Sequence, residues 1–555
     1  MTVHRALERL STTVFVGGAL FVSSTASVAH AQLTGAPDQR FTPAATPSQA
    51  RFGHAVDAGA TRAIVGGHGD DQLGFEAGAA WIFERVDANG DWVEVAKLVA
   101  YDGQVGDQFG YAVALDGDRA LVGAHGRDEA GVVDGGIVHV LERAADGTWS
   151  EVARLAPAAP APFAHFGWSV DLEGDRALVG AVSDSTAGVF AGAAYVFERA
   201  ADGTWSQVAQ LLDPTASFGD SLGHAVALEG DAAFAASLLD DDAGDSAGAV
   251  HAFVRDANGV WSHAQTLTAA VADDGDRLGQ SLAVDGDRLV AGTWIDGDDP
   301  GRAHLFERDA TSGAWVEQQV LVGPDGSTFF GFGVAADLAG DFLVVGARRV
   351  NFGSTQPGMV RAYERDASGV WQWIADVAPD GSQADGRFGS ALAISGPREL
   401  LVGAHTADGA APLSGAAFSA RVGRLMRTRP TVSIAAAGAS ELVLFAGPEN
   451  ARSFHAIVGS FTGTAPVTVV DGVDLPLVWD DYTQVTVVDQ GGGILEGGFG
   501  LTDGSGRATA HFHLPTGLDP ALAGLTLWHA AVVMSPPTFW PPALVTDPVG
   551  IELVP

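Results

Sequence analysis

Aspartates gather in the loops that follow the predicted strands, and one loop carries arginines in their place. A face rich in carboxylates can bind a cationic partner, a polysaccharide or divalent ions, and it can also be a solvated rim that keeps an acidic protein soluble. The loop with Arg348 and Arg349 breaks the pattern and is the best candidate for an asymmetric site. The predicted partner-binding face comprises Asp70, Asp71, Asp128, Asp240, Asp242, Asp245, Asp296, Asp298, Arg348 and Arg349.

Histidines are scattered along the same part of the chain. His54 and His224 each follow a glycine of a recurring motif, and His68, His125 and His405 follow a predicted second strand on the acidic side. A zinc site needs three or four converging ligands, and the spacing of these histidines does not show convergence. No metal ligand is assigned from them.

Sequence signatures of catalysis are missing. The chain has no Gly-x-Ser-x-Gly, His-Glu-x-x-His, Walker or Gly-x-Gly-x-x-Gly pattern, and the cysteine count of 0 excludes thiolate chemistry. No catalytic residue and no cofactor is therefore predicted. Calcium stays an alternative, because Asp87, Asn89, Asp91 and Glu94 have a calcium-loop spacing, although a hairpin turn explains the same residues.

The overall charge limits the partners. Asp and Glu number 68 against 30 Lys and Arg, a formal net charge of −38, which repels nucleic-acid phosphate and anionic membranes. Hydrophobic residues make up 47% of the chain, so large cores can form.

A Phe-Gly motif sets the period of the chain. Its glycines lie 54 to 57 residues apart, and series of Trp and Arg residues keep the same spacing. Three markers in one register identify a repeat architecture. The copies are Phe52-Gly53, Phe109-Gly110, Phe166-Gly167, Leu222-Gly223, Leu278-Gly279, Phe332-Gly333 and Phe388-Gly389.

Each repeat is predicted to form four short strands. In the second copy these are residues 111–115, 120–124, 136–143 and 149–155, separated by Asp-Gly turns and a Gly- and Asp-rich loop. Seven four-stranded units predict a seven-bladed β-propeller, with a linear solenoid as the alternative. The seventh unit lacks a Trp-containing fourth strand, so we expect the segment from about Gln32 to supply it and close the ring.

The motifs resemble a known repeat. Phe-Gly followed by Val-Gly-Ala, an aspartate loop and the sequence Gly-Ala-Ala-Tyr-Val-Phe at 192–197 are similar to the FG-GAP repeat over about residues 50–421. That resemblance implies a propeller like those of integrin α heads and of secreted bacterial proteins. The calcium loop of many FG-GAP repeats is replaced here by turns such as 115–119, which are too short to surround a Ca²⁺ ion.

The two ends of the chain differ from the repeat. Residues 1–31 have an Arg-containing start, a short apolar run and an Ala-His-Ala ending, which is typical of a signal peptide. Residues 32–421 are the propeller, 422–430 a basic linker, and 431–555 a predicted β-sandwich of short apolar strands. In this last part His511 and His513 share a strand face, and a metal pair would need His455 or His529 opposite them.

The sequence thus predicts an all-β protein, a propeller followed by a sandwich, that is exported and has no transmembrane segment. The leading functional hypothesis is a secreted non-enzymatic protein that presents its acidic face to a protein or polysaccharide. The alternatives are an extracellular hydrolase or lyase for polysaccharide or phosphoester, and a structural exoprotein anchored by the C-terminal domain. Ligand and oligomeric state are left open.

Overall fold

The computed structural model divides into two compact units, Pro37–Arg421 and a second one formed by Met1–Ala36 with Val422–Pro555. The structure describes residues 49–85, 92–293, 301–323, 329–350, 358–366, 368–379, 386–407 and 413–422, together with 34–35, 39–41, 43 and the strands beyond residue 424. The first unit ends at Arg421, the residue at which the sequence repeat also stops.

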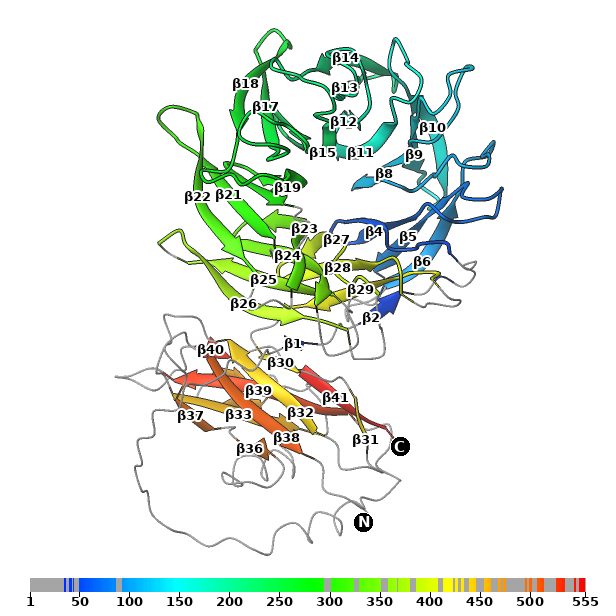
Figure 1. The fold of residues 1–555 in the computed structure, drawn as a ribbon. Helices are drawn as coiled ribbons and strands as arrows, with labels where there is room; N and C mark the ends of the chain where they lie inside the picture. The colour runs from blue at the N-terminus through cyan, green and yellow to red at the C-terminus, as the bar shows by residue number, and fades with distance from the viewer. Residues whose placement is uncertain are drawn as a thin grey trace, which may run out of the picture. The chain divides into compact units, whose positions relative to one another are not determined.

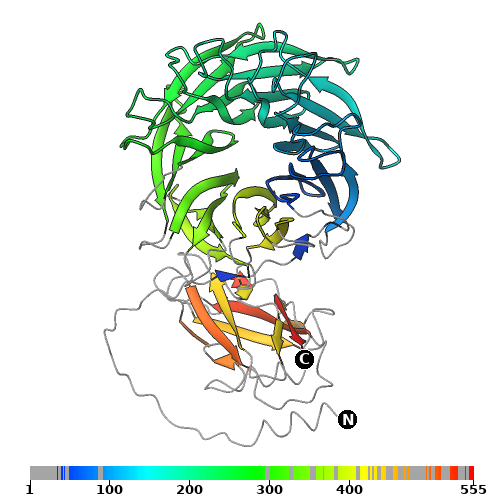
Figure 2. The same ribbon diagram turned by 45° about the vertical axis from the view of Figure 1, so that its right-hand side comes forward.

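The unit Pro37–Arg421 is a seven-bladed β-propeller, and no helix occurs among the residues that the structure describes. Figure 1 and Figure 2 show its sheets following one another around a common axis. The first three blades are β3 (Ala55–Ala58), β4 (Arg62–Gly67), β5 (Ala79–Arg85) and β6 (Trp92–Leu98); β7 (Val113–Asp116), β8 (Arg119–Ala124), β9 (Ile137–Arg143) and β10 (Trp149–Leu155); and β11 (Phe166–Glu173), β12 (Arg176–Ala181), β13 (Ala193–Arg199) and β14 (Trp205–Leu211).

The remaining four blades repeat this order. They are β15 (Leu222–Glu229), β16 (Ala232–Ser237), β17 (Ala249–Arg255) and β18 (Trp261–Leu267); β19 (Leu278–Asp285), β20 (Arg288–Thr293), β21 (Arg302–Arg308) and β22 (Trp315–Val322); β23 (Phe329–Ala339), β24 (Phe342–Val350), β25 (Met359–Arg365) and β26 (Trp371–Val377); and β27 (Ala391–Gly396), β28 (Glu399–Ala404) and β29 (Ala416–Arg421) with β2 (Gln39–Phe41). The four-stranded unit predicted from the sequence is confirmed.

The Phe-Gly motif joins each blade to the one before it. Phe109 is 1% exposed, and Gly110 has a φ of +87°, a backbone conformation that glycine adopts readily. A Cβ atom on Gly110 would lie 2.2 Å from the carbonyl oxygen of Ala79 in the preceding blade. The glycine is therefore required by the close approach of two backbones, and the phenylalanine fills the apolar space between the sheets.

Arginines at the ends of the third strands form ion pairs between blades. Arg143 Nε lies 2.8 Å from Glu84 Oε1 of the preceding blade, and Arg199 pairs in the same way with Glu142 at 3.3 Å. The arginine that recurs with the repeat therefore connects each of these blades to the preceding one.

The N-terminal strand closes the ring. β2 pairs with β29, with Phe41 opposite Ala417, so the outer strand of the seventh blade comes from the start of the chain as predicted. Phe52 also forms a bridge with Gly415, the same parallel bridge that joins Phe109 to Gly78 between the first two blades. The strand lies at 39–41, within the segment expected to begin at about Gln32; Gln32 itself lies outside the described residues.

The second unit contains β1 (Thr34–Gly35) and a C-terminal set of strands. The sandwich stays a prediction, because the side chains there are outside the described residues. His511 and His513 lie on β38, in a sheet with β30, β32 and β36, whereas His455 and His529 lie on β33 and β39 of another sheet. The strands are β30 (Leu425–Arg427), β31 (Thr431–Ser433), β32 (Ala439–Phe445), β33 (Phe454–Ser460), β34 (Thr468–Val470), β35 (Val473–Leu475), β36 (Leu495–Glu496), β37 (Phe499–Leu501), β38 (Arg507–His513), β39 (Thr526–Met534), β40 (Leu544–Val545) and β41 (Val549–Val554).

Candidate functional site

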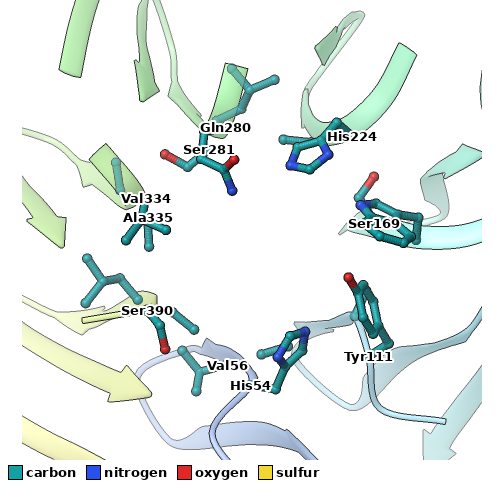
Figure 3. A pocket seen from close by; sticks show the side chains of 18 of the residues that line it. His54, Val56, Tyr111, Ser169, His224, Gln280, Ser281, Val334, Ala335 and Ser390 are labelled. Atoms are coloured by element: carbon teal, nitrogen blue, oxygen red, sulfur yellow. The ribbon is translucent and has the colours of Figure 1, made fainter. Parts of the chain in front are cut away.

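The first strand of each blade lines the central channel. The residue after each motif glycine points into it, and its type changes from blade to blade: His54, Tyr111, Trp168, His224, Gln280, Val334 and Ser390 line a cavity of about 640 Å³. Figure 3 shows the labelled side chains arranged in a ring and directed toward the centre. A repeated backbone position thus supplies six residue types to one channel.

Arginines and histidines gather at the end of the channel where the strands of this ring begin. A second cavity of about 420 Å³ is lined there by Arg51, Arg387, His54, His68 and His405, among others. We call this cavity the channel mouth. Apart from Tyr111 of the second blade, its residues come from the first and seventh blades, which the closure of the ring brings side by side.

The arginines hold two histidines in one tautomer. Arg51 Nη1 donates to His68 Nε2 at 2.7 Å, and Arg387 Nη1 lies 3.4 Å from His405 Nε2 in the equivalent pair. A guanidinium can only donate, so His68 Nε2 accepts and the proton of that neutral ring sits on Nδ1, and the longer contact with Arg387 favours the same tautomer of His405. His54 lies between the pairs, with its ring centroid 4.2 Å from that of His68 and 5.3 Å from that of His405.

Burial keeps these imidazoles neutral. Loss of solvent, with Arg51 and Arg387 nearby, lowers the pKa of His54 to about 4. Burial likewise lowers the pKa of His68 and that of His405 well below the usual value, and the neighbouring His54 and the arginines add to the effect. The positive charge of the mouth at neutral pH therefore comes from guanidinium groups, and it does not depend on histidine protonation.

One contact resembles a nucleophile–base pair. Ser390 Oγ lies 2.9 Å from His405 Nδ1. Because Nδ1 carries the proton when Nε2 accepts from Arg387, this ring donates to the serine and cannot take its proton. A Ser-His-carboxylate triad needs a carboxylate where the guanidinium stands.

The predicted acidic residues lie elsewhere, and none of those described lines the two cavities. Asp70 and Asp240 are buried, and Asp70 Oδ2 accepts from Lys97 Nζ at 2.8 Å. Asp71 and Asp128 accept loop N–H groups, while Asp242 and Asp245 are exposed. Arg348 does line the channel. Asp296, Asp298 and the side chain of Arg349 lie outside the described residues, as do Asp87, Asn89 and Asp91.

The far half of the channel wall carries three aspartates four residues after the motif glycine: Asp57, Asp171 and Asp337. Each accepts a backbone N–H of the next blade, as Asp57 Oδ2 does from Leu115 at 2.6 Å. Burial raises the pKa of Asp57 and that of Asp171 to about 7 and the pKa of Asp337 to about 6, against these hydrogen bonds. These carboxyls connect blades.

Large apolar side chains are exposed in the loops on the side of the channel mouth. The loops between second and third strands bond to those that join blades, as Gly106 N does to Phe75 O at 3.0 Å. Single exposed apolar residues are ordinary, but a group on one face marks an interaction surface. The group includes Phe75 (60% exposed), Tyr101 (79%), Val105 (68%), Phe163 (51%) and Phe218 (75%).

The sequence analysis missed the arginines of the mouth. Arg51 and Arg387 of the mouth, and Arg277 of the channel, each precede a motif pair, and Arg51 has a φ of +55°, which a residue with a side chain adopts only under local constraint. Their recurrence before Phe-Gly or Leu-Gly was the available signal.

Comparison with known proteins identifies the repeat. The sequence profile of the FG-GAP repeat matches residues 92–141, 149–197, 205–253, 261–306 and 315–360. Each match begins at the fourth strand of one blade and ends in the third strand of the next. The chain is an FG-GAP repeat propeller protein. The resemblance stated from the sequence is therefore confirmed, and FG-GAP repeats are typical of extracellular proteins.

Two solved structures are similar to parts of this FG-GAP protein at low sequence identity. A protein from Lactobacillus plantarum is 18% identical, with 60% of this chain and 86% of that chain covered and a TM-score of 0.41. The periplasmic gluconolactonase of Pseudomonas aeruginosa is 17% identical, with 58% and 84% covered and a TM-score of 0.39. A search of curated proteins finds no match. Within the described residues of the FG-GAP protein, no helix is long and apolar enough to cross a membrane.

Proposed function

We propose that this FG-GAP propeller is a secreted, non-enzymatic binding protein whose channel mouth takes an acidic polysaccharide. The carboxylate of a uronic acid unit would bind the guanidinium groups of Arg51 and Arg387, and its sugar ring would lie against Tyr111. Export through residues 1–31 is part of the proposal and rests on their signal-peptide pattern.

The observation that carries the proposal is the pairing of Arg51 with His68 and of Arg387 with His405 around one cavity. Each guanidinium group contacts a neutral imidazole ring. This contact fixes the position of the guanidinium group and leaves its positive charge unchanged. Arg51 Nη2 also lies 3.7 Å from Glu76 Oε1, at the outer side of the loop. Guanidinium groups fixed in this way are suited to bind carboxylates.

The choice of a saccharide rests on Tyr111 beside the arginines and on exposed aromatic residues in loops on the same side of the propeller. Tyr111 lines both cavities, and Phe75, Tyr101 and Phe163 are exposed in the surrounding loops. Aromatic faces beside arginines suit a ligand that alternates apolar ring faces with charged groups. The leading sequence hypothesis, a face that binds a partner, is kept, but the proposed contact is basic and aromatic instead of acidic.

A hydrolase is the competing candidate, and Ser390 with His405 is the observation that favours it. The position of Arg387 on Nε2 of that histidine opposes it, because the ring then lacks a free acceptor for the serine proton. We therefore expect binding without turnover.

The test compares oligogalacturonate with a neutral oligogalactoside of equal length by calorimetry, using the full chain. We expect the acidic glycan alone to bind, and Arg51→Gln with Arg387→Gln to weaken binding at least tenfold. Arg288→Gln is the matched control, since Arg288 pairs with Asp341 at the β19–β20 turn, outside both cavities. Equal binding of the neutral glycan, or an unaffected double variant, would refute the proposal, and release of shorter fragments would establish the hydrolase.

A further inference from the structure

Three blades carry a histidine at the third position of their third strand: His139 on β9, His251 on β17 and His304 on β21. In two of them a glutamate of the fourth strand holds the ring. His139 Nδ1 lies 2.9 Å from Glu151 Oε2, and His304 Nδ1 is paired with Glu317. In the fourth blade His263 stands at that glutamate position, and His251 is held differently.

His251 faces two carboxylates. Its Nε2 atom lies 3.6 Å from Asp213 Oδ2 and 3.7 Å from Asp240 Oδ2. All three residues are buried, with 0%, 4% and 2% of the surface of His251, Asp213 and Asp240 exposed. The ligand atoms of the three residues lie within 4.8 Å of one another.

Hydrogen bonds do not account for the cluster. His251 Nε2 and Asp213 Oδ2 are both buried without a hydrogen-bond partner. The other carboxylate oxygen of Asp213 accepts from Thr215 N at 2.8 Å, and Asp240 Oδ1 accepts from Asp242 N at 3.0 Å. Two buried carboxylates and an unpaired ring nitrogen thus point at one place, an arrangement that is costly without a cation.

In the first and third blades the corresponding buried carboxylate accepts a hydrogen bond from a side chain. Lys97 donates to Asp70 in the first blade, and Tyr195 Oη donates to Asp184 at 2.7 Å in the third. The ion-pair contacts of Asp213 and Asp240 in the described part of the chain are with His251 alone. At this place in the fourth blade, two carboxylates, Asp213 and Asp240, lie together. Among the described residues, no side chain equivalent to Lys97 or Tyr195 donates a hydrogen bond to them there.

The distances suit a metal ion better than a salt bridge. Hydrogen bonds from imidazole are shorter than about 3.2 Å. Ligand atoms about 2.0–2.2 Å from a tetrahedral Zn²⁺ ion lie about 3.3–3.6 Å from one another, close to the two distances from His251. An imidazole with two carboxylates is a ligand set for Zn²⁺ or a similar transition ion, whereas Ca²⁺ and Mg²⁺ favour oxygen alone.

We propose that Asp213, Asp240 and His251 bind one divalent transition-metal ion, with Zn²⁺ as the reference ion. Asp213 follows β14 of the third blade, whereas Asp240 and His251 belong to the fourth. The ion therefore links two neighbouring blades and stabilises their contact. The site is separate from the channel mouth, and it does not depend on the proposed saccharide binding.

The test measures the zinc content and melting temperature of the full chain after dialysis against EDTA and after addition of Zn²⁺. We expect one bound equivalent, a rise of the melting temperature with Zn²⁺, and loss of both in Asp213→Asn. That variant leaves every histidine in place, so zinc bound by the channel histidines would survive it. His304→Gln in the fifth blade is the matched control, since the residue two positions after β18 is Ala269, whereas the residue two positions after β14 is Asp213.

Two further measurements test the same site independently of Asp213→Asn. If Asp213→Asn fails to fold, Asp240→Asn gives the same comparison, and the visible absorption of Co²⁺ added to the unchanged protein reports coordination directly. Absence of a bound ion and of any thermal shift, or zinc binding that both aspartate variants retain, would overturn the proposal.

Discussion

Gln39 and Trp92 exchange two hydrogen bonds across the junction of the last and first blades. Gln39 Nε2 donates to the Trp92 carbonyl at 2.8 Å, and Trp92 N donates to Gln39 Oε1 at 2.9 Å. The same exchange joins Gln265 to Trp315 and Gln319 to Trp371 inside the ring. The segment 39–41 therefore occupies the place of a fourth strand in its contacts as well as in its pairing.

We predict that Gln39→Ala destabilises the propeller as much as Gln319→Ala does. Each substitution leaves a backbone N–H and a carbonyl of a tryptophan without a partner, at a cost of about 1–3 kcal/mol. Urea unfolding of the two variants and of the unchanged protein measures this loss of stability. A loss in Gln319→Ala without one in Gln39→Ala would show that β2 does not close the ring in solution.

Gly53 provides a second test of closure. It has a φ of +85°, and a Cβ atom there would lie 2.2 Å from the carbonyl oxygen of Ala416 in the seventh blade. We predict that Gly53→Ala costs more than about 3 kcal/mol, since both the backbone conformation and the contact are unfavourable.

Gly117 is the matched control for this substitution. Its φ is +59°, and a Cβ atom at this position would have no other atom within 4 Å. Gly117→Ala should therefore cost only about 1 kcal/mol, the conformational part of the penalty. Equal costs for the two glycines in chemical denaturation would contradict a close contact between the first and seventh blades.

The sequence allowed the blades to be predicted, because each repeat carries its own inter-blade contacts in the Phe-Gly pair and the terminal arginine. It did not allow the channel mouth to be predicted. Arg51 with His68 and Arg387 with His405 stand at opposite ends of the repeat array, and only closure of the ring brings them together. The partners of the aspartates could not be predicted from the sequence either, because only the folded chain brings Asp70 into contact with Lys97 and Asp240 into contact with His251.

His125 should make the protein sensitive to acid. Burial lowers its pKa from 6.5 to about 3, so at pH 5 the unfolded chain binds a proton there that the folded chain does not. Stability is therefore lost as the pH falls below about 6.5. We predict that His125→Phe, which keeps the ring contacts with Tyr111 and Trp168, reduces the loss between pH 7 and pH 5 by about 1–2 kcal/mol.

Melting temperatures measured at pH 5 and pH 7 check this prediction. The difference between the two pH values should be smaller in His125→Phe than in the unchanged protein. An equal difference would mean that His125 is protonated in the folded state at pH 5.

Asp57 should have the opposite pH dependence. Burial raises its pKa to about 7, so between about pH 4 and pH 7 the folded chain holds a proton that the unfolded chain has lost. Its contribution to stability therefore falls as the pH rises through this window. We predict that Asp57→Asn has a melting temperature that declines less than that of the unchanged protein between pH 5 and pH 8.

The comparison for Asp57 uses the change of the melting temperature with pH and not its absolute value. The reason is that the asparagine also changes the hydrogen bonds from the N–H groups of Ala58 and Leu115 at every pH. Asp241, an exposed loop residue of the fourth blade, serves as the control when changed to Asn. If Asp57→Asn leaves the change of the melting temperature with pH as it is in the unchanged protein, the pKa of Asp57 lies in the ordinary range.

The most direct test of the proposed function is a crystal structure of the propeller grown with oligogalacturonate. The account predicts a uronate carboxylate within hydrogen-bond distance of Arg51 or Arg387 in the channel mouth. Electron density for the glycan on the outer aspartate loops or on the sides of the blades, with the mouth free of it, would contradict the account.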